Sequence, residues 1–241
     1  MRLAVANLRP LLFAVDNVYK SVDTVLMRRR RPATPPAPLA GRLVAIAEEL
    51  LEEEGVAGLS MREVARRAGV THGAPLRHFR SFAALLSEVA AGGFRDLEAA
   101  VDEAAAAVAP GSGPTARLAA AARAYVACAV KRPGRFAVMF RPELLDTTHP
   151  GFTRDAGGAF EQLVRIVRGA QDAGWRTDAA SRRLAGVLWA GVHGLASLWI
   201  QQSYAAVVRV SSLDDAVSDM IDLATGVRAT PARRKRPHRK E

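Results

Sequence analysis

The feature that most constrains the fold is a series of helix-forming segments, divided by glycine and proline and almost free of strand-like alternation. Helix breakers occur at 55–58, 68–69, 110–114, 133–134, 149–151, 174 and near 226. One short run, at 207–210, has strand character, and it is too isolated to pair into a sheet. Alanine, the best helix former, is abundant in runs such as 118–123. The sequence therefore predicts an all-α fold.

The net charge of +10 comes from the two ends of the chain rather than from its middle. Residues 1–38 contribute +5 and residues 228–241 contribute +6, so the segment between them sums to −1. Both ends are rich in proline and arginine and poor in large apolar residues, a composition that cannot bury enough surface to fold. We predict a disordered, basic and proline-rich extension over 1–38 and a disordered basic tail over 228–241.

Residues that carry catalysis or bind metals are few and scattered. The chain has a single cysteine, Cys128, which excludes an internal disulfide. It has no run of about 18 apolar residues that could form a membrane segment. Both observations favour a cytoplasmic protein. The five histidines, at 72, 78, 149, 193 and 238, have no partner at the spacing of a metal site. Cys128 has no glycine-flanked turn around it, and no phosphate-binding loop is visible. We expect no enzyme activity, no metal and no cofactor.

An amphipathic helix is predicted at the start of the folded region, from about Leu39. Apolar residues recur every three or four positions at 43, 44, 47, 50 and 51, and glutamates at 48, 49, 52 and 53 fill the opposite side. Gly55 suits the left-handed conformation that ends many helices. The first folded element is therefore expected to end at this glycine.

Two further helices are predicted directly after the first. Ser60 and Glu63 form a capping box, in which the Ser60 hydroxyl accepts from the Glu63 amide and the Glu63 side chain reaches back. This short helix stops at Gly69, where a residue without Cβ lets the chain reverse tightly. Thr71 then caps a third helix that has Pro75 in its first turn. A helix, a glycine turn and a second helix form the motif that docks in the major groove of DNA.

The surface of this motif is predicted to be basic. Arginines lie at 62, 66, 67, 77 and 80, against Glu63 alone between residues 60 and 80. Such a surface neutralises phosphates, and small residues at 73 and 74 let the third helix approach the groove floor and read the bases. The Arg28–Arg31 run is interpreted either as a solvated segment or as an arm along the DNA. The predicted DNA-binding residues are Ser60, Arg62, Thr71, His72, Gly73, Ala74, Arg77 and His78.

The segment SMREVARRAGVTHGAPLRHF, residues 60–79, resembles the DNA-binding domain of the TetR family. The resemblance covers roughly residues 39–99 and includes Ala65, Ala68-Gly69-Val70, Gly73, His78-Phe79 and Leu85. It departs at Leu76, where the family usually has an aromatic residue, and at Phe82, where it often has lysine. The resemblance implies a helix-turn-helix domain over 39–99, with its motif at about 60–80. A larger helical bundle over 100–227 is then expected to bind a ligand and dimerise.

A second resemblance lies late in the chain. LWAGVHGL, residues 188–195, is similar to the Trp-x-x-x-His-Gly signature of one class of TetR-family C-terminal domains. In that family the last two long helices of each subunit pack into a four-helix bundle, which implies a homodimer through about 178–203 and 212–225. Gly191 and Gly194 suggest the close approach of another helix. The last helix has an apolar stripe formed by Leu213, Val217, Met220, Ile221 and Ala224.

A ligand site is expected inside the bundle, where helical proteins hold apolar ligands. Trp189 and His193 are four residues apart and lie on one helical face. A histidine in such a place is more often a core residue bonded to a carbonyl, and that alternative stays open. The candidate ligand residues are Phe136, Met139, Phe140, Trp189 and His193.

Together these patterns predict a sequence-specific transcriptional regulator that binds double-stranded DNA as a homodimer. Two reading helices about one DNA turn apart would meet a near-palindromic operator. A small apolar effector would change their separation and release the DNA, so the expected protein is a ligand-responsive repressor. Two alternatives stay open: a ligand-binding helical bundle that does not bind an operator, and a basic protein that binds DNA without specificity.

Overall fold

A computed structural model describes residues 38–210 and 212–226, and within them it contains helices and no strands. The all-α prediction is confirmed. The Arg28–Arg31 run and nearly all of both predicted tails lie outside the described residues. The α-helices are α1 (Leu39–Glu54), α2 (Met61–Arg67), α3 (Phe82–Ala106), α4 (Ala116–Lys131), α5 (Pro133–Met139), α6 (Pro150–Asp172), α7 (Ser181–Ile200), α8 (Ser203–Val208) and α9 (Leu213–Thr225). Three 3-10 turns join them: η1 (Val56–Gly58), η2 (Pro75–Arg77) and η3 (Pro142–Leu144).

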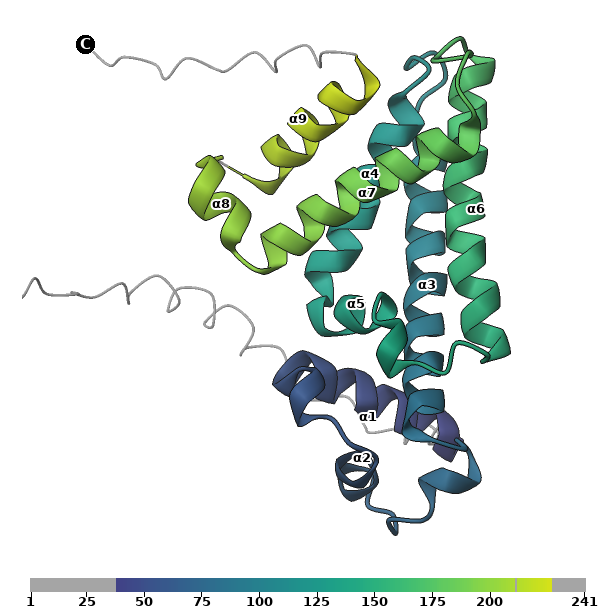
Figure 1. The fold of residues 1–241 in the computed structure, drawn as a ribbon, viewed down its shortest axis with the longest axis vertical. Helices are drawn as coiled ribbons and strands as arrows, with labels where there is room; N and C mark the ends of the chain where they lie inside the picture. The colour runs from purple at the N-terminus through teal and green to yellow at the C-terminus, as the bar shows by residue number, and fades with distance from the viewer. Residues whose placement is uncertain (1–37, 211, 227–241) are drawn as a thin grey trace, which may run out of the picture. The chain divides into compact units, whose positions relative to one another are not determined.

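The longest helix, α3, runs from the end that carries α1 and α2 along the side of α6 (Figure 1). Its first turn is capped by Ser81, whose hydroxyl accepts from the Ala84 amide at 3.0 Å. Leu85, Leu86 and Val89 are fully buried, and α3 packs against α1, α4, α5 and α6. The boundary expected at 99/100 lies inside this continuous helix. The described chain therefore has no linker between its N-terminal helices and its C-terminal bundle.

The first helix forms as its apolar periodicity predicts. Leu43, Ala47, Leu50 and Leu51 are all buried in α1 and face the core. Gly55 follows with φ +67°, and its amide donates to the Leu51 carbonyl at 3.1 Å. This positive φ favours glycine, since other residues are strained there.

The N-terminus of α5 sits directly on α1. The amides of Gly134 and Arg135 donate to the Glu52 carboxylate at 3.0 and 2.9 Å. The Arg135 guanidinium continues the contact to Glu48 at 3.2 Å and to Asp96 of α3 at 2.6 Å. A side chain at 134 would collide with α1, because a Cβ there lies 2.2 Å from the Leu51 carbonyl oxygen. Glycine is therefore required for this approach.

A buried carboxylate ties α6 to α3. Asp155 is 5% exposed and receives Arg154 at 2.6 Å and Arg95 of α3 at 2.7 Å. These two hydrogen bonds, led by the one from Arg154, hold the pKa of Asp155 below its ordinary value. The carboxylate is thus charged and paired where the two long helices meet.

The C-terminal helices are close to the predicted ranges. The helix expected over about 178–203 is α7, and the strand-like run at 207–210 begins inside α8. Ser212 caps α9 by accepting from the Asp215 amide at 3.1 Å, and the Trp175 indole donates to the Thr225 carbonyl at 2.9 Å. One large core cluster includes residues from Leu43 in α1 to Ile221 in α9.

Candidate functional site

The second helix begins at the predicted cap. The Ser60 hydroxyl accepts from the Glu63 amide at 3.2 Å. No bond from the Glu63 side chain back to Ser60 is found in the described chain, and this half of the predicted capping box is wrong. The Glu63 carboxylate instead receives Arg66 at 2.8 Å and Arg67 at 3.4 Å. Hydrogen bonding from Arg66 lowers the pKa of Glu63. The Glu63 carboxylate therefore accepts hydrogen bonds from the Arg66 and Arg67 guanidinium groups and not from the Ser60 amide.

The chain reverses at Gly69 as predicted. Gly69 has φ +68°, its amide donates to the Arg66 carbonyl at 3.2 Å, and the Val70 amide donates to the Ala65 carbonyl at 3.1 Å. These two bonds close the end of α2, and Val70 packs partly buried against the core. The turn therefore fixes the direction in which residues 71–80 leave α2.

The predicted third helix is wrong in its extent. Residues 71–80 contain the single 3-10 turn η2, and no Thr71 side-chain cap is found in this described segment. The amides of Ala74, Arg77 and His78 each donate to the carbonyl three residues back, and only Phe79 reaches four back, to Pro75. Pro75, four residues after the predicted cap, has no amide to donate to the Thr71 carbonyl, so the first α-helical bond of the predicted helix cannot form. The expected reading element is thus a tight 3-10 segment.

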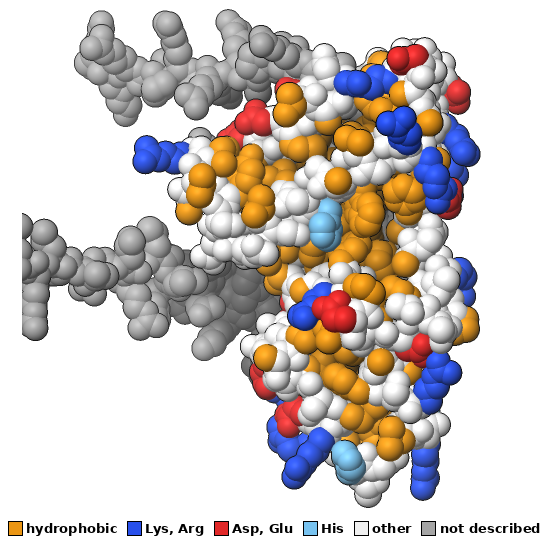
Figure 2. All heavy atoms as spheres, in the orientation of Figure 1, with side chains coloured by type: hydrophobic (Ala, Val, Ile, Leu, Met, Phe, Trp, Pro, Cys, Tyr) orange, Lys and Arg blue, Asp and Glu red, His pale blue; other side chains and the backbone are white. Residues whose placement is uncertain are grey.

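Six of the predicted DNA-binding residues lie on the segment 71–78, and the other two, Ser60 and Arg62, lie at the start of α2. Seven of them, Ser60, Arg62, Thr71, His72, Gly73, Arg77 and His78, are exposed, and Ala74 is half-buried. Pro75 and Phe79 are buried and anchor the segment, and Leu76 between them is 53% exposed. Figure 2 shows basic and histidine side chains around this lower end of the molecule. The segment is held from inside and presents its polar side chains outward.

The charge of this surface differs from the prediction. Arg66 is paired with Glu63, and Arg67 also reaches Glu53 and Glu54 of α1, the latter at 2.8 Å. Arg62 and Arg77, within the part of the chain that the structure describes, form no ion pair. Sequence reasoning missed the α1 glutamates because they lie 13 and 14 residues before Arg67. Two arginines, not five, are thus free to meet an anion.

Arg80 joins this segment to the loop before α6. Its guanidinium donates to Asp146 through two nitrogens, one at 3.1 Å, and to Thr148 at 3.1 Å. The Asp146 amide also donates to buried Ser87 of α3 at 2.9 Å. Hydrogen bonds from Thr148 and then Arg80 lower the pKa of Asp146 to about 2. Arg80 is therefore occupied by a structural contact.

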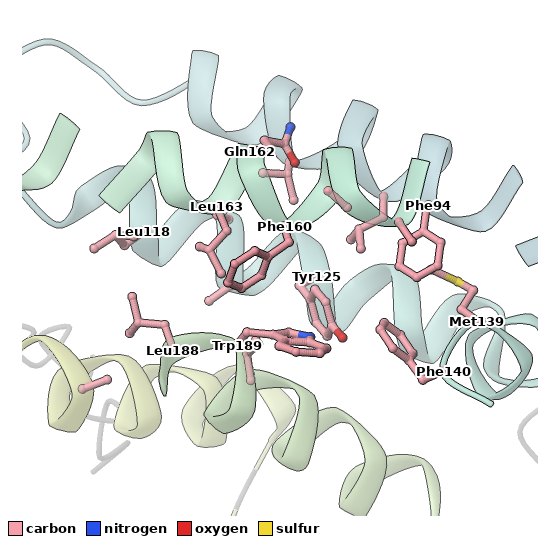
Figure 3. Close-up of a pocket in the computed structure, with 18 of the residues that line it drawn as sticks. Phe94, Leu118, Tyr125, Met139, Phe140, Phe160, Gln162, Leu163, Leu188 and Trp189 are labelled. Carbon is pink, nitrogen blue, oxygen red and sulfur yellow. The ribbon is translucent and has the colours of Figure 1, made fainter. Parts of the chain in front are cut away.

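A cavity of about 410 Å³ lies in the bundle between α3, α4, α6, α7 and α9 (Figure 3). Three of the predicted ligand residues, Met139, Phe140 and Trp189, line it. Sequence reasoning missed Phe94 of α3 and Phe152 and Phe160 of α6, although apolar residues on one face of 150–172 could have indicated the last two. The labelled side chains that line the cavity are Phe94, Leu118, Tyr125, Met139, Phe140, Phe160, Gln162, Leu163, Leu188 and Trp189.

The other two predicted ligand residues lie behind the cavity wall. Phe136 and His193 are not among its lining residues, and their rings are 5.3 Å apart. His193 bonds through Nδ1 to the Tyr125 hydroxyl at 2.8 Å, not to a carbonyl. Burial lowers the pKa of His193 and raises that of Tyr125 well above its ordinary value. Both side chains are therefore uncharged near neutral pH.

The apolar stripe predicted on the last helix faces inward. Val217 and Ile221 are buried in the subunit, and Met220, Ile221 and Ala224 line the cavity. Leu223 is 85% exposed on the other side of α9. The stripe is therefore a feature of the subunit's own core, because α9 packs against α4 and α7.

One face of α7 is apolar and uncovered. Val187 is 70% exposed and Leu198 is 45% exposed, and a Cβ at Gly194 between them would meet nothing within 4 Å. By length and composition alone α7 could cross a membrane, but a single such helix among the described residues is a weak indication. Figure 2 shows apolar side chains over α8 and the adjoining part of α7.

Comparisons with known proteins identify both halves of the chain. Residues 43–89 match the profile described as bacterial regulatory proteins, tetR family. Residues 118–224 match the profile of the Tetracyclin repressor-like, C-terminal domain. No curated protein sequence matches the chain.

Solved structures with the same fold are numerous. A protein of unknown function from Rhodococcus sp. RHA1 is 33% identical, with a TM-score of 0.70 over 81% of this chain and 98% of that one. A tetR-family regulatory protein from Rhodococcus RHA1 is 20% identical, with a TM-score of 0.59 over 79% and 97%. The regulator FadR from Bacillus subtilis, in complex with stearoyl-CoA, is 14% identical, with a TM-score of 0.61 over 78% and 98%.

Proposed function

Because the chain belongs to the TetR family of DNA-binding transcriptional regulators, we propose that it is a homodimeric repressor of a near-palindromic operator, released by a small ligand. The observation that carries this proposal is the exposed 71–78 segment, with unpaired Arg77 on it and unpaired Arg62 beside it. The family and the neighbours whose titles state a function are regulators and not enzymes. We also place the protein in the cytoplasm, because its family consists of DNA-binding regulators.

The DNA-binding proposal rests on how the segment is held. Gly69 turns the chain outward, Pro75 and Phe79 anchor it, and the exposed side chains between them are free to reach base edges. Arg62 and Arg77 supply the phosphate contacts, since phosphate contacts position a protein and base contacts specify the site. At position 76, where the family usually has an aromatic residue, the exposed Leu76 would offer the DNA an aliphatic side chain instead.

The homodimer is supported by the uncovered face of α7. Val187, Gly194 and Leu198 follow one another at intervals of seven and four residues and present an apolar surface with room for a second helix. Exposed apolar patches of this kind mark interaction sites. A two-fold axis through α7 and α9 would pair the same faces of two copies. The apolar stripe predicted on α9 faces the core of the subunit and does not contribute to this surface. The exposed side chain of Leu223 is the apolar contact that α9 would contribute to the dimer.

Ligand response is supported by the position of α5. This helix contributes Met139 at its end to the cavity wall, and its first residues hold Glu52 of α1 through two amides. A ligand that displaces α5 would therefore move α1. Binding of ligand and DNA is then coupled if the ligand has different affinities for the two positions of these helices. Trp189 also faces the cavity, and we assign the C-terminal domain to the Trp-x-x-x-His-Gly class on Trp189, His193 and Gly194.

The experiment is selection of bound DNA from a random pool, followed by affinity measurements over a range of salt concentrations. We expect a selected near-palindrome that binds at least 1,000-fold more tightly than random duplex, about the lower limit for specific binders. Arg77→Ala should lower the salt slope by roughly 0.9 for one lost phosphate contact. The control is Arg168→Ala, at an exposed position of α6, which changes the net charge equally and should leave the salt slope unchanged.

The two alternatives give different results in the same experiment. A nonspecific basic protein would bind selected and random duplex equally. A helical bundle without an operator would bind neither, and Arg77→Ala would then have no effect. Either result would refute the proposed function.

A further inference from the structure

We propose that the bundle cavity takes an uncharged, ring-containing apolar molecule with one hydroxyl group, which bonds to Tyr125. This inference deepens the proposed function, because it names the chemical class of the effector and rests on ligand binding in this cavity. It concerns the protein without DNA and can be tested separately from operator binding.

The charge of the cavity wall limits the ligand first. None of the described residues that line the cavity is Asp, Glu, Lys, Arg or His. A buried charge needs a paired partner, since the cost of removing it from water is large. A ligand carboxylate, phosphate or ammonium group would find no partner there. The cavity therefore selects against charged molecules.

The shape and chemistry of the wall favour rings. Six aromatic side chains line the cavity, and several already meet edge to face: Phe94 and Phe140 at 5.4 Å, and Phe160 and Trp189 at 5.9 Å. Aromatic rings gain additional stabilisation from such contacts beyond the area that they bury. Figure 3 shows Phe94 and Phe140 toward one end, Leu118 and Leu188 toward the other, and Phe160 and Trp189 between them.

The cavity volume sets the size of the ligand. At the packing density of protein interiors, about 410 Å³ accommodates a molecule of roughly 20 non-hydrogen atoms. This is the size of a molecule with three or four fused rings. The cavity volume is near the lower end of the range of volumes found for small-molecule sites.

Among the polar side chains that line this apolar space, Gln162 donates to the Glu98 carbonyl at 2.8 Å and Thr225 donates to the Ile221 carbonyl at 2.8 Å. The Tyr125 hydroxyl bonds to His193 at 2.8 Å. A phenol has one proton to donate and two lone pairs, so this bond leaves positions open to a ligand. If Tyr125 donates to His193, its open positions are acceptors, and if His193 donates to Tyr125, the phenol keeps its proton to donate. A ligand hydroxyl fits both arrangements, because it donates and accepts.

Three matched probes test this class on the full-length protein: 1-hydroxypyrene, 1-methylpyrene and pyrene-1-carboxylate, at pH 7. Binding is measured by quenching of tryptophan emission, to which Trp189 in the cavity wall contributes. We expect 1-hydroxypyrene to bind at least tenfold more tightly than the carboxylate. Tyr125→Phe should weaken 1-hydroxypyrene about fivefold, the value of one hydrogen bond, and leave 1-methylpyrene unchanged.

Cavity occupancy is tested by filling the space. Ala159→Phe, at a lining position of α6, should abolish binding of both neutral probes, whereas Ala127→Phe, exposed on α4, should not change it. Circular dichroism and the affinity for the selected operator without probe confirm that both variants are folded. Equal affinity for the carboxylate, no binding of any probe, or an equal effect of Tyr125→Phe on both neutral probes would overturn the inference. If operator binding is absent and the probe order is as expected, the proposed function fails and the cavity assignment stands.

Discussion

Gly134→Ala is the substitution whose effect follows most directly from the geometry. The new Cβ would lie 2.2 Å from the Leu51 carbonyl oxygen and 2.6 Å from its carbon, both backbone atoms. Since protein Cβ contacts are essentially never shorter than 3.0 Å, α5 and α1 must separate by at least 0.8 Å. That movement would stretch the 3.0 Å bond from the Gly134 amide to Glu52 beyond hydrogen-bonding distance.

The cost of this substitution can be estimated from two opposing effects. Overpacking of a well-packed contact costs about 1–3 kcal/mol. Alanine in place of glycine in a helix returns roughly 0.5–1 kcal/mol. The net expected loss is therefore about 0–2.5 kcal/mol in the free energy of unfolding, with a central value of about 1 kcal/mol. The matched control is Gly157→Ala in α6, where a Cβ meets nothing within 4 Å, and a gain of roughly 0.5–1 kcal/mol is expected.

Urea unfolding followed by circular dichroism measures both variants, and fluorescence anisotropy measures operator affinity. Gly134→Ala should also weaken operator binding, because Glu52 positions α1, whereas Gly157→Ala should leave it unchanged. If Gly134→Ala is as stable as Gly157→Ala, the close approach of α5 to α1 does not exist as described. If it is destabilised but binds the operator normally, α5 does not position the DNA-binding helices.

Three further expectations concern charges and the dimer. Asp155→Asn should destabilise the protein by about 1–3 kcal/mol in thermal unfolding, because Arg95 loses a charged partner at a buried contact, and an unchanged melting temperature would contradict this. The pKa of Asp146 is lowered to about 2 from 3.8, so its contribution to stability is complete above pH 4 and lost as the pH falls toward 2. Asp146→Asn should flatten the acid limb of the stability curve in that window, and an unaltered limb would contradict the stabilisation of the carboxylate by Thr148 and Arg80. Val187→Glu should shift the protein from dimer to monomer by light scattering, whereas a dimer that persists would place the interface elsewhere.

Signals that act over a few residues predicted the local structure well. Gly55, Ser60 and Gly69 each determine a cap or a turn through bonds to residues three to five positions away, and all three are found where the sequence placed them. The prediction of the third helix failed at the same scale, because Pro75 has no amide to donate to the carbonyl of Thr71, four residues back. Residue types that favour a helix start were outweighed by one missing donor.

Contacts between distant residues could not be predicted. Arg80 pairs with Asp146 across 66 residues, and no periodicity in the sequence brings them together. The cavity was predicted only in part for the same reason, since Met139, Phe140 and Trp189 were expected but Phe94 and Phe160, which lie in other helices, were not. His193 shows the limit most clearly: its helical face was predicted, but its partner, Tyr125, is 68 residues away.

The continuity of α3 bears on how the protein unfolds. The helix carries Leu85 and Val89 under the N-terminal helices and Leu97 and Val101 in the bundle, and all four belong to one core cluster. A shared helix and a shared core make separate melting of the two halves costly, because neither half can lose α3 and keep its own packing. The regulator is therefore expected to unfold as one cooperative unit. A fragment cut at 99/100 would lose the end of its longest helix, and DNA-binding activity could not be transferred without the bundle.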